Sequence, residues 1–435
     1  MIESFDTVFA PSSAIGGAIS VIRVSGGQAR SIAQKLLDRP VWEQPDRMRH
    51  ARISRGGETL DDCMAVFFKA PKSYTGEDML ELHCHGGMTV VRRVLAALSE
   101  AGGVPAGPGE FTRRAFLNGK MDLSQAEAVM DVINAQAENS LRAALEQLSG
   151  SVSRRIRESE ERLLNVRAAI EAAIDYPDEA EEAACASLKT DLRAAGETVA
   201  ALIEEGRKGR VLRDGLKLVI LGRPNVGKSS LLNALLGEDR AIVTAAAGTT
   251  RDVLDERISI GGVPVRLIDT AGVREASDEA ERIGVDRAKK ALETADAVLL
   301  VLDGSTPKKP EDEALLSETE GKTRIVIANK SDLGICIPDA LPISCKTGAG
   351  IDELVKRIEA IAAPSAQSTS AITNERHLAA LERAQKAIRR AGEQTEPDCI
   401  ATELAEALHA LGSITGTDVD AEVVDRIFAN FCVGK

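Results

Sequence analysis

The chain has 435 residues, too many for one ordinary hydrophobic core, so two or three domains are expected. Its formal net charge of −13, from 67 acidic and 54 basic residues, excludes a broadly basic nucleic-acid coat but permits a local RNA contact. Seven cysteines without a CxxC pair argue against a zinc ribbon or a disulfide framework. No signal peptide is visible and no apolar run approaches the ~20 residues of a membrane span, so we expect a cytoplasmic protein without membrane association.

The first part of the chain has the pattern of a small α+β domain that ends near residue 118. Its predicted elements are strands over 18–24, 64–68 and 79–85 and helices over 28–37 and 90–98. Side chains alternate along the third strand, so Glu81, His83 and His85 share one face of the sheet. Two imidazoles with no nearby thiolate pair fit surface histidines better than metal ligands. A carboxylate on this face can accept two N–H donors from a heterocycle such as a pterin. Residues 109–120 form a predicted loop and short helix with a basic cluster, for which a solvated surface is the simpler interpretation.

A helical region follows. Apolar residues recur at helical spacing from Leu141 to Ile156 and from Leu163 to Ile174, which predicts long amphipathic helices. After a proline and an acidic run, a third helix is predicted over 188–207, and Gly206 to Gly215 is predicted to be a connector. Helices resume after a Ser/Thr/Ala/Gln-rich segment that follows Pro364 and is a linker by composition.

Helices thus flank an alternating strand–helix region on both sides. We expect one helical domain, 119–210 with 365–435, into which an α/β domain, 211–364, is inserted after the N-terminal domain, 1–118. Two separate helical domains are the alternative. The apolar runs 265–268, 297–302 and 324–328 are typical of buried parallel strands, so the inserted domain is predicted to be doubly wound.

Gly222 to Ser230, GRPNVGKSS, follows the apolar run 216–221 and precedes an apolar helix. This order is that of a P-loop, in which glycines let backbone N–H groups and a helix N-terminus point at a polyphosphate. Lys228 would reach the β- and γ-phosphates, and the hydroxyl of Ser229 would bind Mg²⁺. A chance glycine turn is the alternative, but every fixed position of the motif matches.

Three further motifs follow the predicted strands. Asp269 to Gly272 is placed to hold the Mg²⁺ shell and to bring a backbone N–H to the γ-phosphate. In Asn329 to Asp332, the aspartate can accept N1–H and N2–H₂ of guanine, which adenine does not offer, so GTP is the expected nucleotide. Ser344 to Lys346 is a predicted loop over the base.

Gly248 to Asp252 lies where a switch segment belongs, and Thr250 can complete the Mg²⁺ sphere. Val273 stands where Ras-like enzymes have a glutamine that orients the attacking water. An apolar side chain cannot do so, so another polar residue must: the candidates are Arg274, Glu275, Asp278, Glu279, Glu281 and Arg282.

Together these motifs resemble the MnmE (TrmE) family of tRNA-modification GTPases. The resemblance spans the chain and is also carried by residues 74–78 (YTGED), 85–87 (HGG), 109–111 (GEF) and 431–435 (FCVGK). It implies an N-terminal α+β folate-binding domain, a discontinuous helical domain and an inserted Ras-like P-loop GTPase domain. The residues that it implies for GTP binding are Asn225, Val226, Gly227, Lys228, Ser229, Ser230, Thr244, Ala245, Ala246, Ala247, Gly248, Thr249, Thr250, Asp269, Thr270, Ala271, Gly272, Asn329, Lys330, Asp332, Ser344, Cys345 and Lys346.

The resemblance also implies catalytic roles. Mg²⁺ would be held by Ser229 and Thr250, and a K⁺ ion by the Asn225 side chain with backbone oxygens near Thr244, Ala246 and Thr249. Glu281 matches the family's water-activating glutamate, and Arg274 matches a switch arginine. Activation is expected to follow dimerisation of the GTPase domains across the nucleotide.

For the other domains, the resemblance implies a homodimer that binds 5,10-methylene- or 5-formyl-tetrahydrofolate through Arg23, Glu81, Lys120 and Lys435. Cys432 could be a nucleophile or acid/base near the folate, or only a small residue near the chain end. The implied partner is an MnmG-type flavoprotein that uses FAD and NADH and forms a heterotetramer. The complex would add an aminomethyl or carboxymethylaminomethyl group to C5 of the wobble uridine of tRNA.

Two other functions fit parts of the sequence. A ribosome-assembly GTPase of the Era or Der type would be a switch without modification chemistry, but neither a second P-loop nor a KH-like unit is visible. A membrane-remodelling GTPase would not need Glu81, Lys120 or Cys432. Binding of a reduced folate therefore discriminates between these functions.

Overall fold

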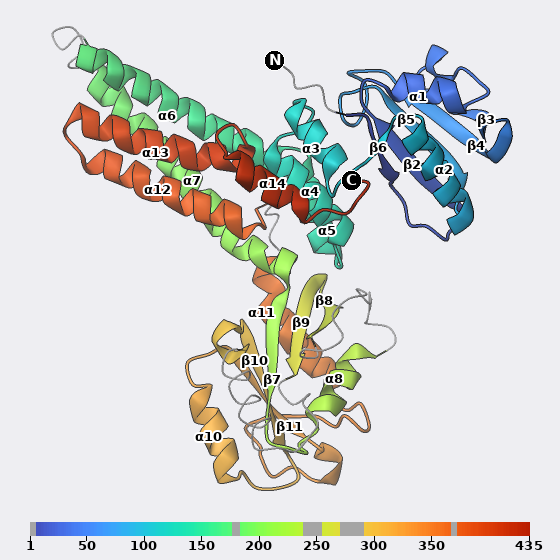
Figure 1. Ribbon diagram of the computed structural model, residues 1–435. Coiled ribbons are helices and arrows are strands. Elements are labelled where there is room, and N and C mark those ends of the chain that lie inside the picture. The colour runs from blue at the N-terminus through green and yellow to red at the C-terminus, as the bar shows by residue number, and fades with distance from the viewer. Residues whose placement is uncertain (1–5, 176–182, 238–254, 270–290, 367–371) are drawn as a thin grey trace. The chain divides into compact units, whose positions relative to one another are not determined.

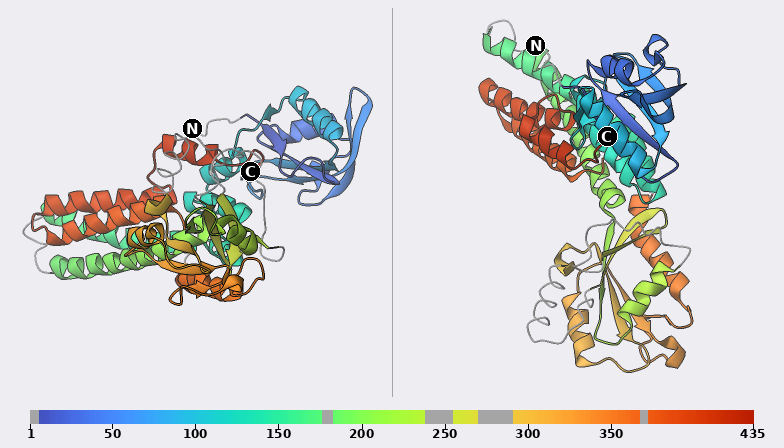
Figure 2. Two further views of the ribbon diagram at one scale, coloured as in Figure 1. Left: turned by 90° about the horizontal axis from the view of Figure 1, so that it is seen from below. Right: turned by 45° about the vertical axis from the view of Figure 1, so that its right-hand side comes forward.

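The computed structural model describes residues 6–175, 183–237, 255–269, 291–366 and 372–435 (Figures 1 and 2). The chain divides into two compact units, one of Met1–Met130 with Leu408–Lys435 and one of Asp131–Ala407. The finer boundaries at 118, 210 and 364 stay predictions. Within the described stretches, no helix has both the length and the apolar character needed to cross a membrane.

A six-stranded sheet forms the centre of the first unit, in the order β3-β4-β5-β2-β1-β6. Neighbouring strands are antiparallel, except that β1 and β6 are parallel. The strands are β1 (Val8–Pro11), β2 (Ile19–Ser25), β3 (Arg49–Arg55), β4 (Glu58–Phe68), β5 (Met79–His85) and β6 (Val104–Pro105). The helices of this unit are α1 (Ala29–Leu36), η1 (Val41–Glu43), α2 (Met88–Glu100), α3 (Glu110–Leu117) and α14 (Ala421–Ala429), with α4 (Leu123–Asn134) running into the second unit. The α+β prediction is confirmed.

The two faces of this sheet differ. Helices α1 and α2 pack on one face, where alternate strand residues such as Ile22, Val24 and Leu82 are fully buried. The opposite face carries a smaller apolar cluster that includes Ala10 and Phe111. Because side chains alternate along a strand, the polar residues between the core positions of β2 and β5 lie on this second face.

The C-terminal segment is part of the first unit. Val424, Phe428 and Phe431 form one buried cluster with Leu123 of α4. The rings of Phe428 and Phe431 lie 5.0 Å apart between centroids, a distance typical of packed aromatic pairs. Burial of these apolar side chains therefore holds the end of the chain against the N-terminal part.

Long helices make up one part of the second unit (Figure 1). They are α5 (Glu138–Leu148), α6 (Ser151–Asp175), α7 (Ala183–Asp214) and α12 (Glu375–Glu393), with α13 (Pro397–Thr415) shared between the units. Helix α7 contacts both α6 and α12. The predicted amphipathic stripe on α6 is confirmed at Leu163, Val166 and Ile170, which are buried, but not at Ile174, which is 41% exposed.

The predicted connector at Gly206 to Gly215 is wrong. Helix α7 continues through Asp214, and Gly215 alone separates it from β7. Arginines that looked like linker residues instead pair with carboxylates of other elements: Arg210 bonds Asp296 at 2.8 Å. Such partners are not visible to a local pattern, so composition misled the assignment.

The second sheet has six strands in the order β12-β11-β10-β7-β9-β8. All pairings are parallel except that of β8 with β9, which adds an antiparallel edge. The elements are β7 (Leu216–Leu221), α8 (Lys228–Leu236), β8 (Asp255–Ile260), β9 (Val263–Asp269), β10 (Ala297–Asp303), α10 (Pro310–Glu318), β11 (Arg324–Asn329), η2 (Ser331–Leu333), β12 (Leu341–Pro342) and α11 (Ile351–Ala366). Apolar cores lie on both faces, one with α8 and α11 and the other with α10, which confirms the doubly wound prediction.

The order of this sheet gathers the predicted motifs at one edge. Strands β7, β9, β10 and β11 are mutually parallel where they pair, so their carboxyl ends point the same way. Ligands of open α/β sheets bind at that edge. The loops after β7, β11 and β12 carry the three predicted motifs whose side chains can be placed there.

Candidate functional site

The loop between β7 and α8 requires glycine at two points. Gly222 has φ +154°, and a Cβ there would lie 2.3 Å from the carbonyl oxygen of Val301. Gly227 has φ +100°, and a Cβ would lie 2.2 Å from Nδ2 of Asn329. Any larger residue would push the loop away from β10 or β11. The two glycines thus hold the loop close against the sheet, with its N–H groups at the start of α8.

Lys228 lies across this loop. Its ammonium donates to the carbonyl oxygens of Gly222 at 2.6 Å and of Arg223 at 2.9 Å. Lys228 is 8% exposed, so its positive charge is held beside the loop and largely out of water. A polyphosphate in the loop would offer stronger, charged acceptors to this ammonium.

Three side chains on the loop and the first turn of α8 face outward. Asn225, Ser229 and Ser230 are exposed. Asn225 has φ +63°, a left-handed conformation that asparagine tolerates better than most residues. The amide of Asn225 and the hydroxyls of the serines are thus accessible oxygen donors, the ligand type that hard cations prefer.

Asn329 connects the phosphate loop with the loop after β12. Its Nδ2 donates to the carbonyl of Val226 at 2.8 Å, and its Oδ1 accepts from the backbone N–H of Cys345 at 3.2 Å. The residue is only 3% exposed, so water does not substitute for these bonds. Next to it, the hydroxyl of Ser344 donates to Oδ1 of Asp332 at 2.6 Å, which orients that carboxylate.

Lys330 and Asp303 form a second link at the same edge. The Lys330 ammonium lies 2.7 Å from Oδ2 of Asp303 at the end of β10. Burial by itself would raise the pKa of Asp303, but hydrogen bonds from Lys330 and Ser305 outweigh it, and the pKa is lowered. Asp303 was missed in the sequence, although an Asp-Gly-Ser triplet at the end of a predicted strand could have indicated it.

Several predicted residues are outside the described part of the chain. They are Thr244, Ala245, Ala246, Ala247, Gly248, Thr249, Thr250, Thr270, Ala271, Gly272, Arg274 and Glu281. Asp269 ends β9. The roles given to all of these residues stay predictions.

On the second face of the N-terminal sheet, Arg23 and Glu81 oppose each other directly across β2 and β5. Both Nε and a terminal nitrogen of Arg23 lie 2.9 Å from Oε1 of Glu81. The guanidinium also lies over the rings of Tyr74, at 5.1 Å, and Phe111, at 5.7 Å. The arrangement is a half-buried ion pair bordered by two aromatic rings.

The neighbouring histidines differ in their partners. Nε2 of His83 lies 3.7 Å from Oε2 of Glu81. Nδ1 of His85 lies 2.7 Å from Oδ1 of Asp61, and His85 is largely exposed. Among the described residues, no group of three or more His, Cys, Asp or Glu side chains could hold a metal ion. His85 is therefore a surface histidine as predicted, whereas His83 is half-buried, and its enclosed Nε2 has no hydrogen-bond partner among the described residues.

A buried arginine supports the loop that carries Tyr74. Arg114 is 2% exposed, and its guanidinium bonds Glu110 at 2.9 Å and Glu77 at 3.1 Å. Tyr74 donates to, or accepts from, the hydroxyl of Thr112 at 2.9 Å, and burial raises its pKa. This network was not predicted from the sequence, in which the four-residue spacing from Glu110 to Arg114 is its only local signal.

The end of the chain is held by main-chain bonds. The N–H of Gly109 donates to the carbonyl of Cys432 at 3.3 Å, and the N–H of Phe111 donates to that of Lys435 at 3.2 Å. Gly434 has φ +99°, and a Cβ there would lie 1.9 Å from the carbonyl oxygen of Pro11. The Cys432 thiol is exposed. Phe111 therefore contacts both the chain end and Arg23: its backbone N–H bonds Lys435, and its ring lies beneath the Arg23 guanidinium.

Lys120 lies near the loop of Tyr74. Its ammonium donates to the carbonyl of Pro71 at 3.0 Å, and its Cγ is 3.3 Å from where a Cβ on Gly76 would lie. Arg23 thus contacts Glu81 directly. The chain end is linked to Arg23 through Phe111, and Lys120 contacts the loop that carries Tyr74, over which Arg23 lies. The assignment of these residues to one ligand stays a prediction.

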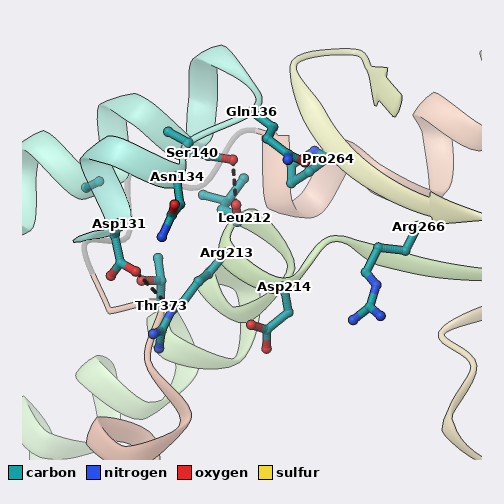
Figure 3. Close-up of a pocket in the computed structure, with 12 residues that line it drawn as sticks. Asp131, Asn134, Gln136, Ser140, Leu212, Arg213, Asp214, Pro264, Arg266 and Thr373 are labelled. Carbon is teal, nitrogen blue, oxygen red and sulfur yellow. Dashed lines mark hydrogen bonds and ion pairs between the residues drawn. The ribbon is translucent and has the colours of Figure 1, made fainter. Parts of the chain in front are cut away.

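A separate pocket in the second unit is shown in Figure 3. Its volume of about 50 Å³ has room for a few water molecules and not for a nucleotide. Among its lining residues, Nε of Arg213 pairs with Oδ1 of Asp131 at 3.0 Å. None of the predicted site residues lines it.

Comparisons with known proteins cover the whole chain. Residues 7–120 match a family model described as the GTP-binding protein TrmE N-terminus, and residues 123–432 match one described as the MnmE helical domain. The chain is 42% identical to a protein named tRNA modification GTPase MnmE from Geobacillus thermodenitrificans, over 99% of each chain. Proteins of the same name from Heliobacterium modesticaldum and Lactiplantibacillus plantarum are 41% and 40% identical, again over 99% of each chain. A solved structure of Era from Aquifex aeolicus is 30% identical over 41% of this chain and 67% of that chain, with a TM-score of 0.27.

Proposed function

Because the chain belongs to the MnmE (TrmE) family of tRNA-modification GTPases, we propose that its GTP hydrolysis drives modification of the wobble uridine of tRNA. The proposed product carries an aminomethyl or carboxymethylaminomethyl group at C5. The one-carbon unit would come from 5,10-methylene- or 5-formyl-tetrahydrofolate. An MnmG-type flavoprotein with FAD and NADH would join a homodimer of this chain in a heterotetramer.

The GTPase part of the proposal rests on the phosphate loop. Lys228 would exchange its two backbone carbonyls for β- and γ-phosphate oxygens, and the exposed Ser229 would present its hydroxyl to Mg²⁺. Asp332, oriented by Ser344, would accept the N1–H and N2–H₂ of guanine. Asn329 would keep the phosphate loop and the base loop at a fixed separation.

Catalysis in this proposal uses a cation in place of an arginine finger. The Asn225 side chain is exposed on a left-handed backbone and offers an oxygen of the kind that K⁺ binds, so the residue fits the role. A bound K⁺ would neutralise charge that develops between the β- and γ-phosphates. The attacking water would be positioned by Glu281, with Arg274 as a further switch residue.

Two kinetic measurements test this site. Hydrolysis should be faster in K⁺ than in Na⁺, and Asn225→Ala should remove the difference, because the amide oxygen is the proposed side-chain ligand. Glu281→Ala should lower kcat and leave GTP affinity nearly unchanged. Equal rates in the two salts would exclude the cation role, and loss of GTP binding in the Glu281 variant would mean that this residue is structural.

The folate part of the proposal rests on the ion pair between Arg23 and Glu81. Oε1 of Glu81 accepts from the arginine, which fixes the carboxylate in place. Its other oxygen can then accept an N–H of a pterin, and the adjacent aromatic rings suit a flat heterocycle. This donor set fits the ligand, which would supply the one-carbon unit when bound.

The charged ends of the proposed folate site are Lys120 and Lys435. Both carry positive charge, and a folate tail carries carboxylates, so their roles would be electrostatic. The exposed Cys432 thiol, three residues before the chain end, would act as nucleophile or acid/base toward the one-carbon unit. The backbone bonds from Gly109 and Phe111 would keep that thiol on the N-terminal unit.

Titration calorimetry with a reduced folate tests this site directly. Glu81→Gln should weaken binding by about ten-fold or more, because one charged acceptor is lost. Glu58→Gln is the matched control, since Glu58 also pairs with an arginine, Arg93, but at an exposed position. The absence of wild-type binding at millimolar folate would overturn the assignment, as would equal affinity of the Glu81 variant.

The full-length relatives favour the proposed function over the two others considered for the sequence. The two matching family models describe MnmE and TrmE domains, and the full-length relatives are named tRNA modification GTPase MnmE. A ribosome-assembly switch or a membrane-remodelling GTPase would leave the Arg23 and Glu81 pair without a ligand. Nucleoside analysis of wobble uridines in cells that lack this chain would decide the reaction itself.

A further inference from the structure

Arg223, the second residue of the phosphate loop, forms a buried ion pair that no sequence motif announces. Its Nε lies 2.7 Å from Oδ1 of Asp312 in the first turn of α10. The Asp312 side chain is 1% exposed and that of Arg223 is 15% exposed, so water hardly reaches the carboxylate and reaches the guanidinium only in part. The two residues are 89 positions apart, and the bond therefore joins the phosphate loop to α10, the helix that follows β10 in the chain.

The Asp312 carboxylate has two functions at once. Its Oδ2 accepts from the backbone N–H of Lys309 at 3.0 Å, which caps the N-terminus of α10. Its Oδ1 is left for Arg223. The cap orients the carboxylate, so the helix presents a fixed anion to the loop.

Arg223 lies in the part of the loop whose backbone positions Asn225 and Lys228. Two backbone positions later, Asn225 has the left-handed conformation, and the carbonyl of Arg223 itself accepts from the Lys228 ammonium. The loop is held against β10 at Gly222 and tied through Val226 to Asn329. Arg223 is the residue between these points whose side chain reaches a separate helix.

We propose that Arg223 is a positioning residue for GTP turnover, which holds the phosphate loop in its binding conformation by pairing with Asp312 of α10. In this role Arg223 acts by fixing the backbone that carries Asn225 and Lys228, and it need not contact the nucleotide. The inference rests on GTP binding at this loop and is independent of the folate and tRNA chemistry.

The same unit contains a matched control. Arg210 bonds Oδ1 of Asp296 at 2.8 Å, and Oδ2 of that aspartate accepts from the backbone N–H of Lys217 at 2.9 Å. This pair also shares a carboxylate between an arginine and a backbone N–H, but it lies at the start of β7, at the opposite end of that strand from the phosphate loop. Loss of either pair should lower the stability of the fold, but only loss of the Arg223 and Asp312 pair should weaken GTP binding.

The experiment compares Arg223→Gln, Asp312→Asn, their double variant, Arg210→Gln and Asp296→Asn in the full chain. Asparagine at 312 keeps an oxygen for the Lys309 N–H, so the helix cap is retained while the charge is removed. We measure the Kd of a fluorescent guanine nucleotide, kcat and KM for GTP, and the thermal midpoint. Arg223→Gln and Asp312→Asn should each weaken nucleotide binding by about ten-fold, and the double variant by no more than either.

The control variants should lower the thermal midpoint by less, because Arg210 and Asp296 are more exposed than Arg223 and Asp312, and should leave Kd within about two-fold of the wild type. If Arg223→Gln changes Kd no more than Arg210→Gln does, the positioning role is excluded. If the effects multiply in the double variant, Arg223 does not act through Asp312. Should Asp312→Asn fail to fold, the comparison of Arg223→Gln with Arg210→Gln still decides. Absence of nucleotide binding by the wild type would instead contradict the GTP site itself.

Discussion

Replacing Asn329 with alanine removes the side chain that connects the phosphate loop to the base loop. Two bonds are lost, from Nδ2 to the Val226 carbonyl at 2.8 Å and from the Cys345 N–H to Oδ1 at 3.2 Å. Val226 is buried and Cys345 is half-buried. The carbonyl is therefore left without a partner, whereas the N–H can regain water in part.

The expected cost follows from these environments. An unsatisfied buried polar group costs about 1–3 kcal/mol, and the partly rehydrated N–H less, so the free energy of unfolding should fall by about 2–3 kcal/mol. GTP must then restore the relative position of the two loops on binding. If about 2 kcal/mol of that cost is paid in the complex, Kd should rise about thirty-fold.

Fluorescent guanine-nucleotide titration and urea unfolding measure the two quantities. Asn118→Ala is the control, because Asn118 also donates from Nδ2 to a carbonyl, that of Thr75 at 2.7 Å, but in the first unit. It should leave Kd unchanged. An unchanged Kd in Asn329→Ala, with stability lowered as expected, would refute the idea that this amide sets the loop separation needed for GTP.

Three further outcomes concern the first unit. Arg114→Met should lower the free energy of unfolding by about 3 kcal/mol in urea titrations, because the half-buried carboxylates of Glu77 and Glu110 lose their buried cation. Gly434→Ala should displace the chain end, since its Cβ would lie 1.9 Å from the Pro11 carbonyl oxygen, and should speed carboxypeptidase digestion. Because the pKa of Tyr74 is raised, its phenol contributes fully to stability below pH 10.0, the pKa in the unfolded chain, and this contribution is lost as the pH rises through the higher folded-state pKa. Tyr74→Phe should therefore reduce the loss of unfolding free energy measured between pH 8 and 11.

Controls for these outcomes are present in the chain. Arg93→Met removes an exposed ion pair and should change the free energy of unfolding by less than about 1 kcal/mol. Gly107→Ala adds a Cβ that meets nothing within 4 Å, so digestion of the chain end should not change. A loss in Arg114→Met as small as that in Arg93→Met would contradict the role given to the buried network.

The amino-acid sequence alone was sufficient for the features that depend on local pattern. The strands 79–85 and 216–221 were predicted to the residue, because alternation and a short apolar run are read directly from neighbouring positions. The phosphate loop was predicted from its glycine spacing, which reflects the backbone conformation of that loop alone. The family followed from several such motifs in order, and the comparisons confirmed it.

Only the tertiary structure decided which distant groups meet. The end of α7 was misassigned because the carboxylates that hold its arginines lie on other elements. Arg114 with Glu77, and Arg223 with Asp312, are separated by 37 and 89 residues, so no periodicity could relate them. Sequence patterns report how one segment satisfies its own backbone and its own apolar face. A buried charge is satisfied by whichever group the fold brings beside it, and that choice exists only once the chain has packed.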